Sequence, residues 1–121
     1  MVSLSGIDVR TVDLKTQLKM IGSAPTDLGI GAVPDGMKRW ITFVKYINEY
    51  IGINTVFLCS GTSALNAASG IAKDRQSFGK RFDMVGYPEP PSNLFSIAAS
   101  KFLTAFSAKG KVALLVQYYD E

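Results

Sequence analysis

The segment 37–48 limits the possible folds more than any other part of this chain, because it has the pattern of a strand that is apolar on both faces. Its residues are mainly β-branched or aromatic, the types that are enriched in sheets. Strict alternation gives two faces, with Ile41, Phe43 and Ile47 on one and Trp40, Val44 and Tyr46 on the other. The outward face of a strand in a monomeric sandwich is usually polar. A second apolar face therefore indicates a cover from another segment or from a neighbouring chain.

The rest of the chain supplies further short apolar runs, separated by turn residues, and no convincing long helix. The runs expected to be strands are 55–59, 80–85, 94–98, 101–107 and 112–119. A hairpin turn is expected at 108–111, and the long stretch 60–79 is expected to be a surface connection or an assembly loop. A chain of 121 residues is expected to form a single hydrophobic core. These features predict an all-β fold, an antiparallel β-sandwich of jelly-roll-like type.

The N-terminal region has its own pattern, since apolar and polar residues alternate over 11–20. This period of two predicts a strand, whereas a helix with Leu14, Leu18 and Ile21 on one face remains an alternative. A stretch rich in glycine and proline follows and cannot continue a helix. We therefore expect an extended N-terminal arm at 1–22, a Gly/Pro linker at 23–36 and a β-sandwich domain at 37–121.

The composition argues against catalysis, because the chain has no histidine. The absence of histidine excludes Ser-His and Cys-His catalytic pairs and every histidine-containing metal site. Ser60 and Ser63 therefore lack a base, and the aspartates do not have the dense spacing of a calcium loop. The single Cys59 lies in an apolar run and is expected to be a buried, inert thiol. We predict a protein that is not an enzyme, with no catalytic, cofactor-binding or metal-binding residues.

Charge and hydropathy indicate the expected compartment and partners. The 13 basic residues exceed the 10 acidic ones by only three and are spread along the whole chain, so nucleic acid is not expected as a partner. No window approaches the roughly 18 consecutive apolar residues that would span a bilayer, so no membrane partner is expected. The first residues lack the pattern of a secretory signal peptide, which predicts synthesis in the cytoplasm.

Apolar residues make up 47% of the chain and charged residues only 19%, so we expect a single copy to leave apolar sheet surface uncovered. Self-association would cover it, with an alternating arm adding to a sheet edge of a neighbour. The residues predicted to form this interface are Val12, Leu14, Leu18, Met20, Trp40, Val44, Tyr46, Leu115 and Tyr119. The alternative is a module that binds carbohydrate or a host receptor through Trp40, Tyr87 and Tyr50.

Four segments carry a resemblance to a group of known proteins. They are 33–41, with its Pro-Asp-Gly turn and basic-then-apolar strand, the strand that ends at Asn48, the run 54–58 and the terminal 117–121. Over about residues 33 to 121 this pattern resembles small β-sandwich virion structural proteins of tailed phages and related viruses. The resemblance implies a capsid-decorating (cement) or minor capsid protein located in the virion. It also implies a homo-oligomer, with a trimer favoured, whose other partner is the major capsid protein or another virion protein.

Overall fold

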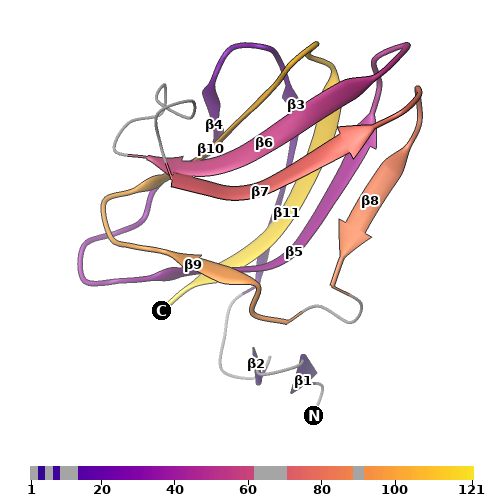
Figure 1. The fold of residues 1–121 in the computed structure, drawn as a ribbon. Helices are drawn as coiled ribbons and strands as arrows, with labels where there is room; N and C mark the ends of the chain where they lie inside the picture. The colour runs from indigo at the N-terminus through magenta and orange to yellow at the C-terminus, as the bar shows by residue number, and fades with distance from the viewer. Residues whose placement is uncertain (1–2, 5–6, 9–13, 62–70, 89–91) are drawn as a thin grey trace.

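The computed structural model describes residues 3–4, 7–8, 14–61, 71–88 and 92–121, and within these ranges it contains strands and turns but no helix. The strands are β1 (Ser3–Leu4), β2 (Ile7–Asp8), β3 (Lys15–Ile21), β4 (Thr26–Ala32), β5 (Arg39–Asn48), β6 (Asn54–Gly61), β7 (Ile71–Phe78), β8 (Met84–Tyr87), β9 (Phe95–Ile97), β10 (Phe102–Ser107) and β11 (Val112–Asp120). The pair β1–β2 forms a small sheet of its own. The remaining strands form two antiparallel sheets, as Figure 1 shows, so the predicted all-β antiparallel sandwich is confirmed.

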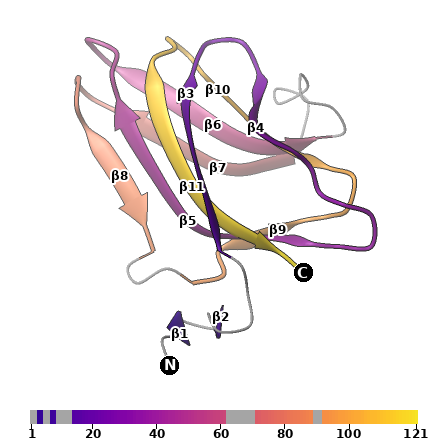
Figure 2. The same ribbon diagram turned by 180° about the vertical axis from the view of Figure 1, so that it is seen from behind.

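The order of the strands is that of a jelly roll. One sheet has the order β3-β11-β5-β8, with β9 also paired to β5, and the other has the order β4-β10-β6-β7 (Figures 1 and 2). The pairs β3–β11, β4–β10, β5–β8 and β6–β7 are therefore nested one inside the next along the chain. Such nesting describes one long hairpin rolled into two layers, which is the eight-stranded jelly-roll plan.

The structure differs from the expected division into arm, linker and sandwich. Ile21 pairs with Val112 and Lys15 with Tyr118, so β3 belongs to the five-stranded sheet of its own chain and is a strand rather than a helix. The Gly/Pro-rich stretch contains β4. Its pairing with β10 is irregular, and the left-handed backbone at Gly29 (φ 79°) and Gly31 (φ 74°) allows this irregularity. The strands β3 and β4 are therefore parts of the sandwich.

The expected connection 60–79 also contains a strand, β7, and the expected strand 80–85 divides into a turn followed by β8. The pattern of β7 gave no strand signal, because Asp74 and Gln76 occupy positions where an apolar residue is usual. The Gln76 amide donates to Asp74 Oδ1 over 3.2 Å, and Asp74 also accepts a hydrogen bond from Tyr46. These bonds satisfy polar groups that would otherwise make the strand unfavourable.

The core lies between the two sheets and is built from their inward-facing side chains. Its largest fully buried members are Tyr46, Ile21, Leu28, Ile41, Leu58, Ile97, Leu103, Leu114, Val33, Val44, Val56 and Val112. Cys59 is also buried, as expected, and burial raises the pKa of its thiol. The core draws on both sheets, so each sheet keeps one outward face.

A bulge in β5 decides which of its side chains enter the core. Ile41 pairs with Tyr118 and Phe43 with Gln117, which leaves Thr42 as an extra residue in β5. The Thr42 hydroxyl lies 3.1 Å from Gln117 O and 3.0 Å from Gln117 Oε1, and it donates to these acceptors. The alternation changes phase at this point. The predicted faces are therefore wrong for Ile41, which shares the inner face with Val44 and Tyr46, whereas Phe43 and Ile47 lie on the opposite face as expected.

A hydrogen bond across the sandwich joins β5 to β7. The Tyr46 hydroxyl donates to Asp74 Oδ2 over 2.7 Å, and Tyr46 is fully buried. Burial, together with the Asp74 carboxylate, raises the pKa of Tyr46 well above its ordinary value. The same two causes raise the pKa of Tyr87, which lies beside the same carboxylate. Both tyrosines are therefore held in the neutral form by the fold.

We expect this pair to make the stability of the protein fall in alkaline solution. Above about pH 10 the unfolded chain ionises Tyr46 whereas the folded chain does not. The stabilising contribution of neutral Tyr46 should be fully present below about pH 10. Above this pH the free energy of unfolding should decrease by up to about 1.4 kcal/mol for each pH unit from this one residue. Urea unfolding between about pH 8 and 11 measures the slope. Tyr46→Phe should reduce it; equal slopes in the natural protein and in Tyr46→Phe would contradict the assignment.

Candidate functional site

The outward face of the five-stranded sheet carries a continuous set of apolar side chains, which we call the outer apolar face. Its members are Leu18, Met20, Phe43, Ile47, Met84 and Leu115. The register arranges most of them in two rows across the strands. One row is Met20, Ala113, Ile47 and Met84, and the next is Leu18, Leu115, Lys45 and Gly86.

Several of these side chains are unusually exposed for their type. Leu18 is 66% exposed, Met84 58% and Met20 56%, while Ile47 and Leu115 between them are partly covered. Figure 2 shows β3, β11 and β5 side by side across this sheet. Single exposed apolar residues are common on protein surfaces, whereas a contiguous apolar patch that spans several strands is a feature that interaction surfaces share.

One charged residue, Lys45, stands within the two rows. Gly86 lies beside it on β8, and a Cβ at that position would come within 3.4 Å of Lys45 Cγ, so the missing side chain leaves room for the lysine stem. Among the described residues, no carboxylate lies within ion-pair distance of Lys45. The face therefore offers apolar contact and a single cation, and no nucleophile or acid–base pair.

The structure brings together three of the predicted interface residues. Leu18 and Leu115 are direct cross-strand partners, and Met20 lies one row away on β3. Phe43, Ile47 and Met84 complete the face but were not among the predicted residues. Alternation places Phe43 and Ile47 on one face of β5, but both faces are apolar, so the sequence gives no signal that this face points outward.

Other predicted interface residues lie elsewhere. Val44 and Tyr46 have no exposed surface, so a neighbouring copy cannot contact them, and the prediction that they are interface residues is wrong. Alternation separates them from Phe43 and Ile47, but with apolar residues on both faces it gives no signal of which face is the inner one. Tyr119 is 4% exposed and its hydroxyl donates to Asn93 Oδ1. Leu14 is partly buried and precedes β3, and Val12 falls outside the described residues.

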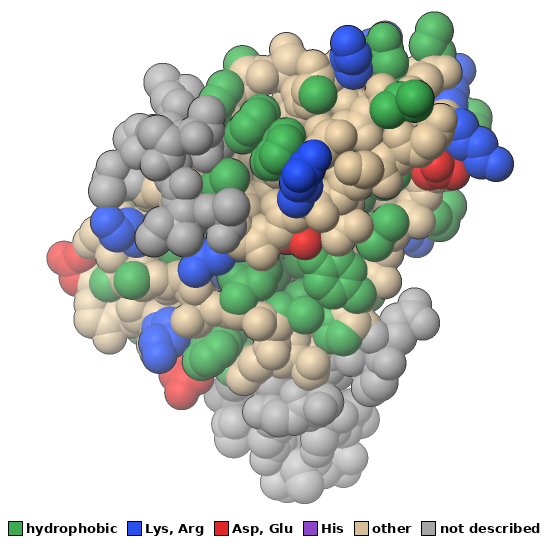
Figure 3. Space-filling view, in the orientation of Figure 1, with side chains coloured by type: hydrophobic (Ala, Val, Ile, Leu, Met, Phe, Trp, Pro, Cys, Tyr) green, Lys and Arg blue, Asp and Glu red, His purple; other side chains and the backbone are tan. Residues whose placement is uncertain are grey.

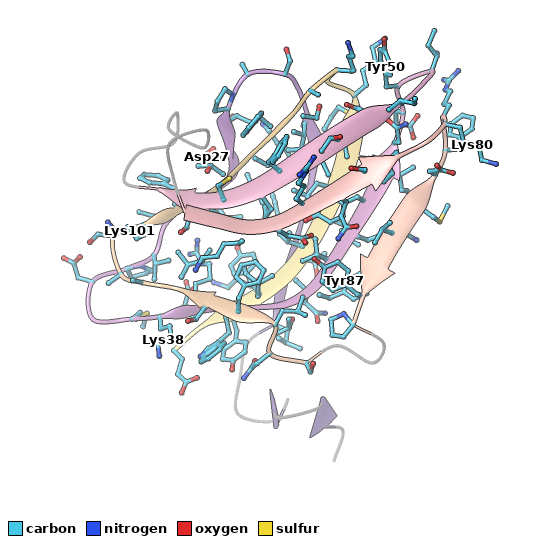
Figure 4. All side chains as sticks on the ribbon, in the orientation of Figure 1. Asp27, Lys38, Tyr50, Lys80, Tyr87 and Lys101 are labelled. Atoms are coloured by element: carbon cyan, nitrogen blue, oxygen red, sulfur yellow. The ribbon has the colours of Figure 1, made fainter. Side chains whose placement is uncertain are left out.

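Trp40 lines a separate hollow at the end of the molecule where β5 begins. The hollow has a volume of about 380 Å³ and is lined by Gly36, Met37, Lys38, Trp40 and Glu121. Lys38 Nζ lies 5.2 Å from the centre of the Trp40 ring, so a cation already covers part of the ring. Figure 4 shows that Tyr50 and Tyr87 lie away from Lys38. The three aromatic residues proposed for sugar binding therefore do not form one platform.

Two further observations concern other kinds of site. In the part of the chain that the structure describes, no three histidine, cysteine, aspartate or glutamate side chains gather where they could hold a metal ion. Among the same residues, no helix is long and apolar enough to cross a membrane.

Comparisons with known proteins show a shared fold without a shared sequence. No protein-family model matches the chain, and no curated protein matches it. Among solved structures, a protein of the disulfide-linked pili that form Bacillus endospore appendages has a TM-score of 0.52 at 11% identity. That match covers 91% of this chain and 85% of the pilus protein. This likeness shows the fold alone.

Two weaker structural likenesses do not show a common fold. A pentameric capsid protein from metagenomic phage sequences has a TM-score of 0.37 at 11% identity, covering 86% of this chain and 59% of the capsid protein. PirA has a TM-score of 0.37 at 12% identity, covering 89% of this chain and 92% of PirA.

Proposed function

We propose that this protein is a non-enzymatic structural component whose copies assemble through the outer apolar face. The observation that carries the proposal is the contiguous exposure of Leu18, Met20 and Met84 around the partly covered Ile47 and Leu115. The occupant of the face is a second copy of this chain. Complete burial of such a side chain contributes about 1.5–3 kcal/mol, so several of them buried together offset a cost of association of about 4–15 kcal/mol.

The single charge on the face favours a cyclic assembly over a face-to-face dimer. In a two-fold pair centred on the rows, the Lys45 side chains of both copies would be brought together and buried without a partner, which is costly. In a ring, the outer apolar face of one copy meets a different surface of the next, so the two lysines stay apart. This argument favours a ring, and the sequence resemblance implies that the ring has three copies.

The finer role that we propose is the coating or reinforcement of a viral shell, as a decoration, cement or minor capsid protein of a virion. The sequence resemblance over 33–121 supports this role, and the jelly-roll order of the strands agrees with it. The proposed second partner is the major capsid protein or another virion protein. The assembled protein is then expected to cosediment with viral shells.

Assembly is tested by size-exclusion chromatography with light scattering at micromolar concentration. We expect a mass of three chains for the natural protein. Leu18→Glu should raise the dissociation constant at least about tenfold, because it removes a buried leucine and places a charge in the interface. Leu18 is exposed in the single copy, so the variant should fold normally.

The matched control is Ser77→Glu, which adds the same charge at an exposed position of β7 in the other sheet. It should leave the mass unchanged. A monomer at micromolar concentration, or an oligomer that tolerates Leu18→Glu as well as Ser77→Glu, would contradict the proposed assembly.

A second candidate function, the binding of a carbohydrate or host receptor, is favoured by the hollow at Trp40. The hollow combines a partly exposed indole, on which a sugar ring can stack, with the charged groups of Lys38 and Glu121, which can form hydrogen bonds to sugar hydroxyls. Glycan binding that is lost in Trp40→Ala and kept in Leu18→Glu would favour this function over assembly.

A further inference from the structure

Three loops meet at one end of the sandwich, and together they form what we call the tip. They are the β5–β6 loop (49–53), the β7–β8 turn (79–83) and the β10–β11 turn (108–111). Figure 1 shows them at the same end of the two sheets, and Figure 4 labels Tyr50 and Lys80 there. This end of the molecule is separate from the Trp40 hollow.

Two buried asparagines fix the loops of the tip to one another. The Asn48 amide donates to Gly52 O over 3.0 Å and to Lys80 O over 2.8 Å, which joins the first two loops. The Asn54 amide donates to Asn48 Oδ1 over 3.2 Å and to Gly110 O over 2.8 Å, which adds the third. Because both asparagines are buried, the tip presents a defined backbone to the solvent.

The tip exposes three large apolar side chains. Ile51 is 79% exposed, Ile53 74% and Phe82 59%. Phe82 also has a left-handed backbone (φ 67°), which is rare and costly for a bulky residue. The Phe82 N–H donates to Asn48 O over 2.7 Å and holds this conformation. Since Phe82 contributes little to the core, packing does not explain a phenylalanine at this position.

Cations surround the apolar side chains of the tip. The charged residues of the three loops are Lys80, Arg81, Lys109 and Lys111, with Glu49 and Asp83 as the acids, so the tip carries +2 of the chain's net +3. Asp83 Oδ2 accepts hydrogen bonds from the N–H groups of Gly79 (2.9 Å) and Lys80 (3.2 Å), so its charge is used within the turn. The Arg81 guanidinium stacks 4.6 Å from the centre of the Phe82 ring. Figure 3 shows apolar and basic side chains gathered at this end.

We propose that the tip docks peripherally on an anionic phospholipid surface. Ile51, Ile53 and Phe82 enter the boundary between headgroups and acyl chains, and the surrounding lysines and Arg81 contact the lipid phosphates. A lipid surface fits better than a protein partner, because three loop ends offer a small contact whereas a stable protein interface buries about 800 Å² on each side. The sequence-based expectation of no membrane partner rested on the absence of a spanning segment, which peripheral docking does not need.

The test is cosedimentation of the full chain with vesicles of phosphatidylcholine alone and with vesicles that also contain phosphatidylserine. We expect binding only to the vesicles with phosphatidylserine, and a decrease of at least about tenfold in the partition coefficient at high salt. Equal binding to both kinds of vesicle, or no binding to either, would overturn the proposal. The absence of binding to both kinds of vesicle would favour a protein as the partner of the tip.

The decisive variant is Phe82→Asn, because asparagine tolerates the left-handed backbone that phenylalanine resists. It should keep or raise the stability of the fold and lower the partition coefficient at least about tenfold. Met37→Ser removes an exposed apolar side chain at the Trp40 hollow and should bind vesicles like the natural protein. A Phe82→Asn protein that folds and binds unchanged would overturn the proposal. The variant Leu18→Glu should bind vesicles as a dissociated copy, so failure of the assembly proposal and failure of tip docking are distinguishable.

Discussion

Arg39→Ala is expected to reduce the free energy of unfolding by about 3–5 kcal/mol, because it leaves the partner of a buried ion pair without its cation. Arg39 is 3% exposed and lies opposite Asp120 in the register of β5 and β11. Its Nε donates to Asp120 Oδ1 over 2.7 Å and its Nη2 to Asp120 Oδ2 over 2.9 Å. The third nitrogen, Nη1, donates to Gly31 O over 3.1 Å. The guanidinium therefore joins both long strands of one sheet to β4 of the other.

Urea unfolding monitored by circular dichroism measures this loss, with Lys38→Ala as the exposed neighbouring control that should change stability by less than about 0.5 kcal/mol. Arg39→Lys should also be clearly destabilising, since an ammonium cannot form the paired bonds of a guanidinium. The double variant Arg39→Met with Asp120→Leu should recover most of the loss, because no charge is then left unpaired. A single Arg39→Ala protein as stable as the natural one would show that the pair does not stabilise the fold.

The second large effect is expected for Asn54→Ala, at about 3 kcal/mol or more, because several buried polar groups lose their partner at once. Asn54 is 2% exposed and bonds to Asn48 and Gly110 through its amide N–H groups. Its Oδ1 accepts from the backbone N–H groups of Thr55 and Lys109, both over 2.9 Å. The alanine side chain can neither donate to the two acceptors nor accept from the two backbone N–H groups.

Asn93→Ala is the matched control for this substitution, since the Asn93 side chain accepts one hydrogen bond from Tyr119 and is only partly buried. It should cost about 1 kcal/mol. Asn54→Asp should resemble Asn54→Ala, because a carboxylate keeps the acceptor but loses both donors. Equal losses for Asn54→Ala and Asn93→Ala would mean that the buried network contributes no more than one ordinary bond.

Sequence predicted the strands that follow simple rules of pattern. The expected runs 112–119 and 101–107 correspond to β11 and β10, and 55–59 lies within β6, because these segments combine strong β-propensity with apolar inner faces. The strand prediction for 11–20 fits β3 in its described part. Leu18, Met20 and Leu115 lie on the outer apolar face for the same reason, since alternation alone fixes their side of the sheet. Their role as an interface stays a prediction.

The remaining differences come from interactions between segments far apart in the sequence. The bulge at Thr42 is stabilised by hydrogen bonds to Gln117, and the sequence near Thr42 gives no signal of a bulge. The polar inner face of β7 depends on Tyr46, 28 residues before Asp74. Local patterns could not have shown either partner, and both errors follow from this.

The nested order of the strands also sets a constraint on how the molecule forms. β11 lies between β3 and β5 in the five-stranded sheet, yet the ribosome makes it after both of them. Until β11 is inserted, β3 has no neighbour within its sheet and β5 has an unpaired edge. Closing such distant contacts is slow, as is typical of β-sandwiches, and the waiting edges can pair with other nascent chains. Rapid synthesis at high concentration should thus favour aggregates of half-made sheets, and slower synthesis should favour the native molecule.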